Sequence, residues 1–287
     1  MCVIWGIPYL LIKIAVRDLT PGTLVWARTA FAGLLLLPLA ASRRELRPLL
    51  GYWKPVLAYT AVEIAVPWFL LSNAELKLSS SLSGLLVAAV PLVGVVLGRI
   101  TGSSEHMGTV QIGGLLLGLV GVGALVGFDV HTSDAAAVAT MGIVVTCYAG
   151  GPQIIKRHLG EAPPLGVVTA SLLLTAIAYT PVAIVQWPRH VPAASVISSV
   201  AVLVTVCTAL AFLVFFALIA EIGAVRSTVI TYLNPAVALL LGATILGERV
   251  TVGMGAGFVL VLAGSALATR RPAVAAEEVA PVGVSRS

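Results

Sequence analysis

Two charged side chains lie inside long apolar stretches of the sequence. Glu63 lies about halfway along Trp53–Ser72, and Arg28 lies within Leu19–Ala41. A charge at the centre of a bilayer costs roughly 2.5–3.5 kcal/mol on insertion scales, so charges inside a span usually face the protein interior and find partners there. The two residues therefore predict either an Arg28–Glu63 ion pair or a substrate or proton site that uses the same two groups.

A polar stripe near the end of the chain has helical spacing. Ser227, Thr231 and Asn234 follow one another at i, i+4 and i+7, with Pro235 and Tyr232 beside them, which places them on one face of a helix. Hydroxyl groups in such positions can serve only hydrogen bonds between helices. The amide of Asn234 needs partners of its own, so we expect the stripe to line a cavity, with bonding between helices as the alternative.

Four of the prolines inside apolar stretches are Pro8, Pro91, Pro152 and Pro235. Each lacks an N–H group and leaves the carbonyl four residues earlier without its helical partner. An unpaired carbonyl at membrane depth is tolerated only against protein or a water-filled cavity. We predict that these prolines are hinges in helices that bend around a central cavity; plain packing kinks are the alternative.

The prolines belong to a pattern that occurs twice. Gly6-Ile7-Pro8 returns as Gly150-Gly151-Pro152, and Pro91 returns as Pro235 at the same separation. Three further pairs follow at a separation one residue shorter: Glu105 and Glu248, Gly114 and Gly257, and Gly121 and Gly264. Chance rarely aligns so many positions over such a distance, so we predict two homologous repeats, residues 1–133 and 134–270.

The composition is that of a protein embedded in lipid. Apolar residues make up 59% of the chain and charged residues 10%, with a mean hydropathy of +1.06, whereas soluble proteins are about a quarter charged. Most of the apolar stretches reach the roughly 17–25 residues that cross a bilayer. We predict an all-α integral membrane protein with ten transmembrane helices, because buried helices of a soluble protein would leave no polar face for water. The stretches are Cys2–Val16, Leu19–Ala41, Trp53–Ser72, Leu82–Ile100, Met107–Phe128, Ala135–Ile155, Leu165–Trp187, Val196–Ala220, Val225–Leu246 and Val250–Thr269.

Basic residues are distributed unevenly about the ends of these stretches. With a cytoplasmic N-terminus, eleven Lys and Arg residues flank cytoplasmic ends and four flank outer ends, in agreement with the positive-inside rule. We therefore predict a cell-membrane protein with both termini cytoplasmic, and a disordered cytoplasmic tail at residues 271–287. Five helices per repeat is an odd number, so the second repeat is expected to be inverted, an arrangement typical of transporters.

Several classes of chemistry find no support in the sequence. The His and Cys residues have no metal-ligand spacing. GxxxxGK[ST], HExxH and GxSxG motifs are absent, so we expect neither ATP hydrolysis nor zinc or serine hydrolysis, no cofactor and no enzymatic activity. The pI of about 9.4 reflects bases beside helix ends, so we expect the lipid bilayer rather than nucleic acid as partner.

Small-residue motifs such as Gly114-x-x-x-Gly118 and Gly253-x-x-x-Gly257 serve packing within a monomer or a homodimer seam equally well.

Four segments resemble EamA-type members of the drug/metabolite transporter superfamily. They are Trp5-Gly6-Ile7-Pro8-Tyr9, Arg28 with Phe31–Pro38 after it, Leu78–Leu86 running to Val90-Pro91-Leu92, and Tyr232-Leu233-Asn234-Pro235 running to Glu248. The resemblance spans residues 1 to about 270. It implies ten helices in two inverted five-helix repeats, a central cavity lined mainly by helices 1–4 and 6–9, and export or exchange of small metabolites, amino acids or drugs. The fourth helix departs from the family pattern, because it ends Leu97-Gly98-Arg99 rather than in Gly-Glu.

Together these features predict a secondary transporter, with export as the expected direction, of amino-acid-like or amphipathic solutes by alternating access. Arg28 and Glu63 would form its charged site, with proton coupling through Glu63 left open. The walls would be Trp68, Tyr148 and Tyr232, and Thr231 and Asn234 would add polar contacts. An uncoupled channel or facilitator and a multidrug efflux pump are the alternatives.

Overall fold

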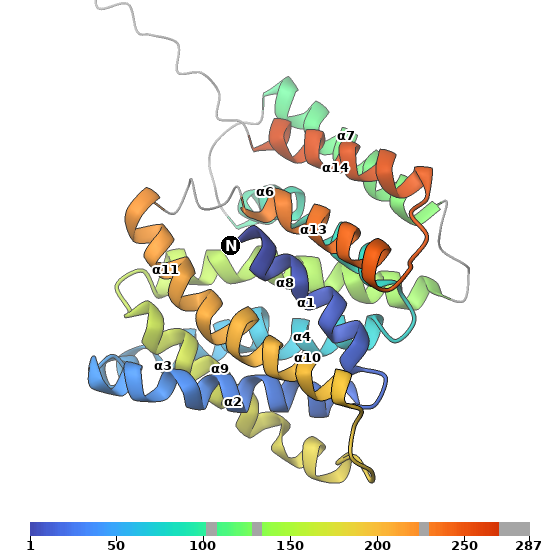
Figure 1. The fold of residues 1–287 in the computed structure, drawn as a ribbon. Helices are drawn as coiled ribbons and strands as arrows, with labels where there is room; N and C mark the ends of the chain where they lie inside the picture. Colours follow the sequence, from blue (N-terminus) through green and yellow to red (C-terminus); the bar gives the residue numbers. More distant parts are fainter. Residues whose placement is uncertain (102–107, 128–133, 224–229, 270–287) are drawn as a thin grey trace, which may run out of the picture.

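A computed structural model of the chain describes residues 1–101, 108–127, 134–223 and 230–269, and throughout these ranges the regular secondary structure is helical (Figure 1). Several residues of the sequence predictions lie outside them: Glu105, Ser227, the side chain of Thr231 and the expected tail. The helices of the first part of the chain are α1 Cys2–Ala15, α2 Pro21–Ser42, the 3₁₀ helix η1 Arg47–Tyr52, α3 Trp53–Tyr59, the π-helix η2 Thr60–Ala65, α4 Val66–Ala74, α5 Ser80–Val87, α6 Val90–Ile100 and α7 Thr109–Gly127. Those of the second part are α8 Ala135–His158, α9 Pro164–Val185, α10 Ala194–Val204, the π-helix η4 Thr205–Leu210, α11 Ala211–Ile222, α13 Ile230–Ile245 and α14 Val252–Ala268.

Seven helical segments among the described residues are long and apolar enough to cross a bilayer. They include the composite segments Arg47–Ala74 and Ala194–Ile222, each of which contains a π-helix. Three further apolar helices are shorter: Cys2–Ala15, Tyr232–Ile245 and Val252–Ala268. The chain is therefore an all-helical membrane protein, and the expected count of ten spans depends on these three short helices.

Hydroxyl side chains define the starts of several helices. The Thr20 hydroxyl accepts a hydrogen bond from Thr23 N at the start of α2, where Pro21 occupies the first turn. The Ser79 hydroxyl likewise accepts from Leu82 N, and the Thr251 hydroxyl accepts from Met254 N. Such caps satisfy N–H groups that have no partner within the helix. Local sequence thus fixes where α2, α5 and α14 begin.

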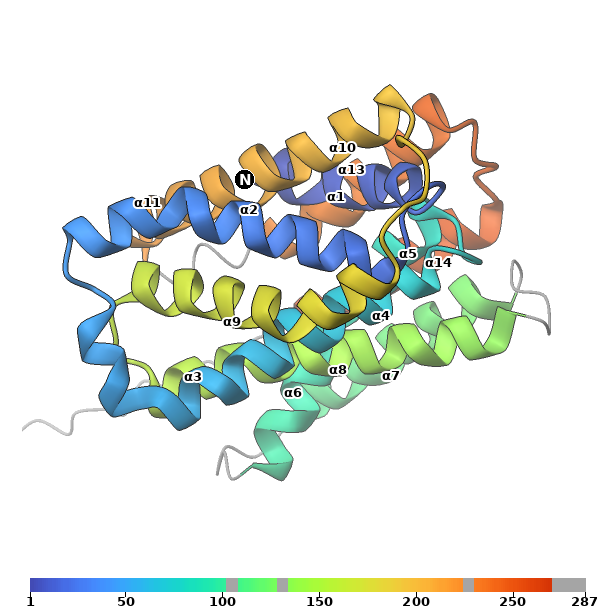
Figure 2. The ribbon, with the colours of Figure 1, turned by 90° about the horizontal axis from the view of Figure 1, so that it is seen from below.

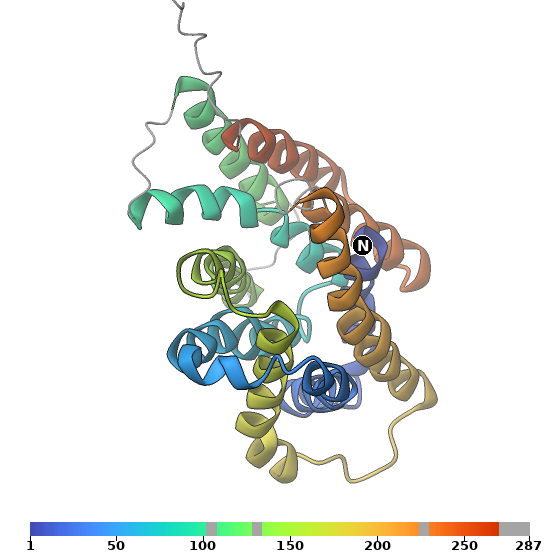
Figure 3. The same ribbon diagram turned by 90° about the vertical axis from the view of Figure 1, so that its left-hand side faces the viewer.

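Helices distant in sequence pack in pairs. α14 packs against α7, α2 against α9, α13 against both α1 and α5, and α4 against α8. The α7–α14 pair and the α2–α9 pair lie on opposite sides of the bundle, as Figures 1 and 3 show. Seen from below, α2 lies between α10 and α9 (Figure 2). The helices that carry Arg28 and Glu63 therefore lie within the main bundle, away from the α7–α14 pair.

Glycines allow α7 and α14 to approach closely. A Cβ at Gly257 would lie 2.8 Å from Gly121 O, and one at Gly264 would collide with the backbone of Gly118. At Gly123 and Gly127, by contrast, an added Cβ would meet no atom of the described residues within 4 Å. Gly121, Gly257 and Gly264 thus serve helix packing within the chain, which is one of the two roles predicted for such glycines beside a homodimer seam.

Candidate functional site

Arg28 on α2 is almost completely buried, with 7% of its surface exposed. Its Nε donates a hydrogen bond to Thr208 Oγ1 at 2.9 Å, and its guanidinium carbon lies 3.7 Å from the centroid of the Trp68 ring. A guanidinium over an indole face is attracted by the ring quadrupole, most strongly where water is excluded. Arg28 is thus held between η4, which carries Thr208, and α4, which carries Trp68.

The expected ion pair between Arg28 and Glu63 is not formed, although both residues are described. Glu63 Oε2 is buried and has no hydrogen-bond partner in the described part of the chain. The side chain packs against α8, where a Cβ added to Gly151 would lie 2.8 Å from Glu63 Cδ. The carboxylate occupies the space that Gly151 leaves, whereas the guanidinium is directed toward Thr208 and Trp68. The ion-pair alternative is therefore wrong for this conformation.

Two π-helical turns carry these residues, η2 with Glu63 and η4 with Thr208. A π turn breaks the regular i→i−4 ladder, and such turns are frequent at functional sites. The Tyr179 hydroxyl donates to Ala65 O at 2.9 Å, and the Thr208 hydroxyl donates to Leu203 O at 2.7 Å. Since α9 packs against η2 and α2 packs against η4, each π turn is stabilised by a helix from the other half of the sequence.

Tyr148 on α8 packs against both of the larger hydrophobic clusters. It lies within electrostatic range of Arg28 and of Glu63. Trp68, with 7% of its surface exposed, belongs to one of these clusters. The structure thus brings together four of the predicted substrate-binding residues, Arg28, Glu63, Trp68 and Tyr148.

The predicted residues of α13 lie elsewhere. The Tyr232 hydroxyl is 3.3 Å from Thr269 Oγ1, just after α14. In the amide orientation that satisfies its neighbours, Asn234 Nδ2 donates to Cys2 O at 2.9 Å and to Ile230 O at 3.0 Å. These contacts join α13 to α1 and α14, which corresponds to the alternative of hydrogen bonding between helices. A role for Tyr232, Asn234 and Thr231 in substrate binding stays a prediction.

The four predicted hinge prolines differ in position. Pro8, Pro152 and Pro235 lie inside α1, α8 and α13. Pro91 lies in the first turn of α6, because α5 ends at Val87 and α6 begins only at Val90. A proline is well tolerated in a first helical turn, where its missing N–H would have no partner. At the predicted kink, a two-residue turn at Ala88 and Ala89 thus separates α5 from α6.

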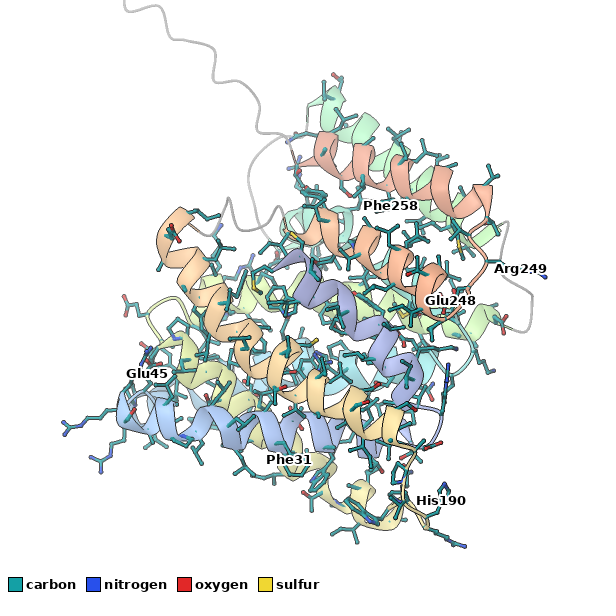
Figure 4. All side chains as sticks on the ribbon, viewed as in Figure 1. Phe31, Glu45, His190, Glu248, Arg249 and Phe258 are labelled. Atoms are coloured by element: carbon teal, nitrogen blue, oxygen red, sulfur yellow. The ribbon has the colours of Figure 1, made fainter. Side chains whose placement is uncertain are left out.

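Two pockets flank this group of residues. One, of about 500 Å³, lies between α2, α10 and the loop after α9, and its lining includes Trp26, Phe31, Trp187 and His190; Figure 4 labels Phe31 and His190 on this side of the molecule. The other, of about 380 Å³, lies between α6 and α8. Its lining includes Val62 and Cys147, the neighbours of Glu63 and Tyr148. This second pocket reaches the immediate surroundings of Glu63 from the end of α8 that carries Arg157.

Sequence reasoning missed a second group of ionisable residues, formed by Lys13, Glu75 and Glu248. Lys13 Nζ donates to the backbone oxygens of Glu75 and Leu78. Glu75 is 0% exposed, and Glu248 accepts from Ser80 N and Ser81 N at 2.8 and 2.9 Å. Glu75 lies just beyond the apolar stretch Trp53–Ser72, after Asn73 and Ala74, so its sequence position resembles that of a solvated loop residue. Only the packing of α1 and of the α13–α14 loop against it shows that it is buried.

Comparisons with known proteins agree with these features. The sequence model of the EamA-like transporter family matches residues 1–127 and 136–270. The chain is similar to the uncharacterized transporter YvbV of Bacillus subtilis (strain 168), with 25% identity over 295 residues that cover 99% of this chain and 93% of YvbV. A solved crystal structure has a similar fold, with a TM-score of 0.68 at 20% identity, covering 93% of this chain and 94% of that one. The chain belongs to the EamA-like transporter family.

Proposed function

We propose that this protein is a secondary transporter that exports small organic solutes of amino-acid-like or amphipathic character by alternating access. The observation that carries the proposal is the pair of π turns, one with Glu63 bearing an unpartnered buried oxygen and the other holding Arg28 through Thr208. Buried polar groups are almost always hydrogen-bonded. An unpartnered carboxylate oxygen beside a second pocket is therefore a candidate ligand for a substrate ammonium or hydroxyl group.

Arg28 would receive the opposite end of such a solute. Its hydrogen bond within the described residues is made by Nε, so the terminal nitrogens of the guanidinium remain for a carboxylate. Arginine binds carboxylates through two parallel N–H···O bonds, and such charge-assisted bonds are stronger than neutral ones. Trp68 and Tyr148 would then supply the apolar walls on which the body of the solute packs.

The proposal includes the membrane arrangement. Ten spans would form two inverted repeats, residues 1–133 and 134–270, with both termini cytoplasmic and the protein in the cell membrane. Three observations support it: the short helices α1, α13 and α14 are apolar, η2 and η4 recur in the third helical segment of each half, and α2 packs against α9. Two similar halves that rock about a site between them would expose it alternately to each side.

A second candidate, multidrug efflux, is favoured by one observation. The pocket of about 500 Å³ contains three large aromatic side chains, Trp26, Phe31 and Trp187, and opens beside exposed apolar residues of α2 and α10. Such a pocket suits an amphipathic molecule that enters from the bilayer. Phe31 and Trp187 would then affect transport more than Arg28 does.

Counterflow in proteoliposomes tests the proposal. The purified protein would be reconstituted in vesicles loaded with one unlabelled solute of an amino-acid and drug panel, and uptake of the same labelled solute would be followed. Alternating access predicts uptake stimulated by the internal solute and loss of that stimulation in Arg28→Gln but not in Arg17→Gln, which alters an exposed residue. Uptake without such stimulation would identify a channel. Stimulation that survives Arg28→Gln and is lost in Trp187→Ala would favour the efflux pump.

A further inference from the structure

Glu75 is the most completely buried carboxyl group in the described part of the chain. It lies directly after α4, in the loop that leads to α5, and is 0% exposed. Neither Oε1 nor Oε2 has a hydrogen-bond partner among the described residues. The hydroxyls of Ser80 and Ser83 on α5 are also buried without partners. The role of Glu63 and Arg28 in solute binding does not account for this group.

The charged and titratable groups around Glu75 come from four elements. Lys13 and Tyr9 lie on α1, Tyr148 lies on α8, and Glu248 lies in the loop after α13. The fourth element is the loop after α4, which carries Glu75 itself. Tyrosine is neutral at ordinary pH, so the charge balance depends on one lysine and two carboxylates. If both carboxylates were ionised, one negative charge would remain uncompensated in a buried site.

Glu248, unlike Glu75, has a hydrogen-bond partner for each of its two carboxylate oxygens. It accepts from Ser80 N at 2.8 Å and from Ser81 N at 2.9 Å, at the start of α5; Figure 4 labels it beside Arg249 in the α13–α14 loop. A carboxylate that accepts N–H bonds at a helix N-terminus is favoured by those bonds and by the helix dipole. Glu248 thus joins the two halves of the sequence through these hydrogen bonds.

Glu75 has no such support. Lys13 Nζ donates to the backbone oxygens of Glu75 and Leu78, the second at 2.7 Å, and not to the Glu75 carboxylate. An isolated ionised carboxylate in an apolar environment takes up a proton rather than remain charged. Burial accordingly raises the pKa of the Glu75 carboxyl well above its usual range. The positive charge of Lys13 lowers this pKa in part, and the negative charge of Glu248 raises it further.

We propose that Glu75 is a proton-binding site that closes this end of the helix bundle when it is protonated. In the structure, Glu248 in the loop after α13 bonds to the start of α5, and Lys13 joins α1 to the segment between Glu75 and Leu78. Opening would admit water to Glu75, break its O–H bond and release the proton to solvent, leaving a carboxylate that Lys13 can pair with. The coupling of this step to transport rests on the proposed function; the proton site itself does not.

Thermal unfolding of the purified full chain as a function of pH tests the site without any substrate. The folded state would bind this proton more tightly than the unfolded state, so the contribution of Glu75 to stability is greatest at low pH and is lost as pH rises through the raised pKa. For one proton the unfolding equilibrium constant changes by about tenfold per pH unit between the unfolded and folded pKa values. Glu75→Gln, which retains shape and neutrality, should remove this slope, whereas Glu161→Gln, at an exposed position, should retain it.

Equal slopes in the wild type and in Glu75→Gln would overturn the proposal. Should Glu75→Gln fail to fold, Lys13→Gln offers a second measurement, because loss of the ammonium must shift the fall in stability to higher pH; no shift counts against the proposal. Sodium and choline chloride at equal ionic strength separate a proton from a metal cation. Stabilisation of the wild type by sodium alone, absent in Glu75→Gln, would assign the site to sodium and refute the proton assignment.

The counterflow experiment and the pH experiment test the two proposals separately. Absence of counterflow with a normal pH slope would refute the transporter mechanism and leave the proton site in place. Counterflow with no Glu75-dependent slope would refute the proton site alone.

Discussion

Glu63 and Thr208 are both the fourth residue of a six-residue π-helical turn, η2 in one half of the sequence and η4 in the other. Thr208 receives the Arg28 Nε at 2.9 Å, whereas Glu63 Oε2 has no partner in the described part of the chain. α2, which carries Arg28, packs against η4, and α9, which has the small residue Ser171 one repeat later in the sequence, packs against η2. The two π turns thus differ in what they hold: one accepts a hydrogen bond from the Arg28 guanidinium, and the other carries a carboxyl group whose Oε2 has no partner among the described residues.

Replacing Thr208 with valine should weaken both folding and exchange. The substitution leaves Arg28 Nε without a partner in a site where Thr208 is 0% exposed, at an expected cost of about 1–3 kcal/mol. Thermal unfolding and counterflow would be measured together. Thr205→Val is the matched control, because Thr205 lies in the same π turn and its hydroxyl donates to the Ala201 carbonyl one turn earlier. Equal effects of the two variants would show that Thr208 does not position Arg28.

Glu63→Gln should preserve protein yield and reduce exchange of solutes that carry an ammonium group. No ion pair with Arg28 is broken by this change, so the buried guanidinium keeps Thr208 and Trp68 as partners. Yield by fluorescence-detected chromatography and counterflow would be compared in the same preparations. A collapse of yield that Arg28→Gln rescues would instead show that the two residues pair in another conformation.

Gly151→Ala on α8 tests whether transport requires the position that the Glu63 carboxylate occupies against that helix. The new methyl would lie 2.8 Å from Glu63 Cδ and closer still to Oε2, so the carboxylate must move away from α8. We expect impaired counterflow, with a loss of stability of about 1–3 kcal/mol typical of overpacking. Gly142→Ala on the same helix is the control, because nothing described lies within 4 Å of its methyl position. Wild-type exchange in Gly151→Ala would exclude a fixed position for Glu63 as a requirement.

Pro91→Ala and Pro235→Ala should retain expression and slow transport. The first would allow α5 and α6 to join across the break between Val87 and Val90, and the second would restore a backbone bond to the carbonyl of Thr231. Stiffer helices should rock more slowly between the two states. Pro38→Ala provides a control inside α2. Near-normal turnover of the double variant would reduce both prolines to packing features.

The sequence alone determined the class of this protein. Helix formation and membrane insertion depend on local composition and on runs of apolar residues, which each segment carries for itself. The resemblance carried by Trp5–Tyr9, Arg28 and Tyr232–Pro235 was confirmed for the family as a whole. The same local logic predicted that Glu63 and Arg28 face the interior, because hydrocarbon penalises a charge whatever its eventual partner is.

Tertiary structure decided which groups meet. Arg28 bonds to Thr208 rather than to Glu63 because η4 and α4 bring a hydroxyl and an indole to its two sides, and no spacing in the sequence encodes that approach. Asn234 bonds to Cys2 because α1 and α13 are in close contact at Gly6. Glu75 is buried because α1 and the α13–α14 loop converge on a segment that by itself resembles a solvated turn. Pairing between distant side chains is a property of helix packing, and packing depends on the whole surface of each helix rather than on any one motif.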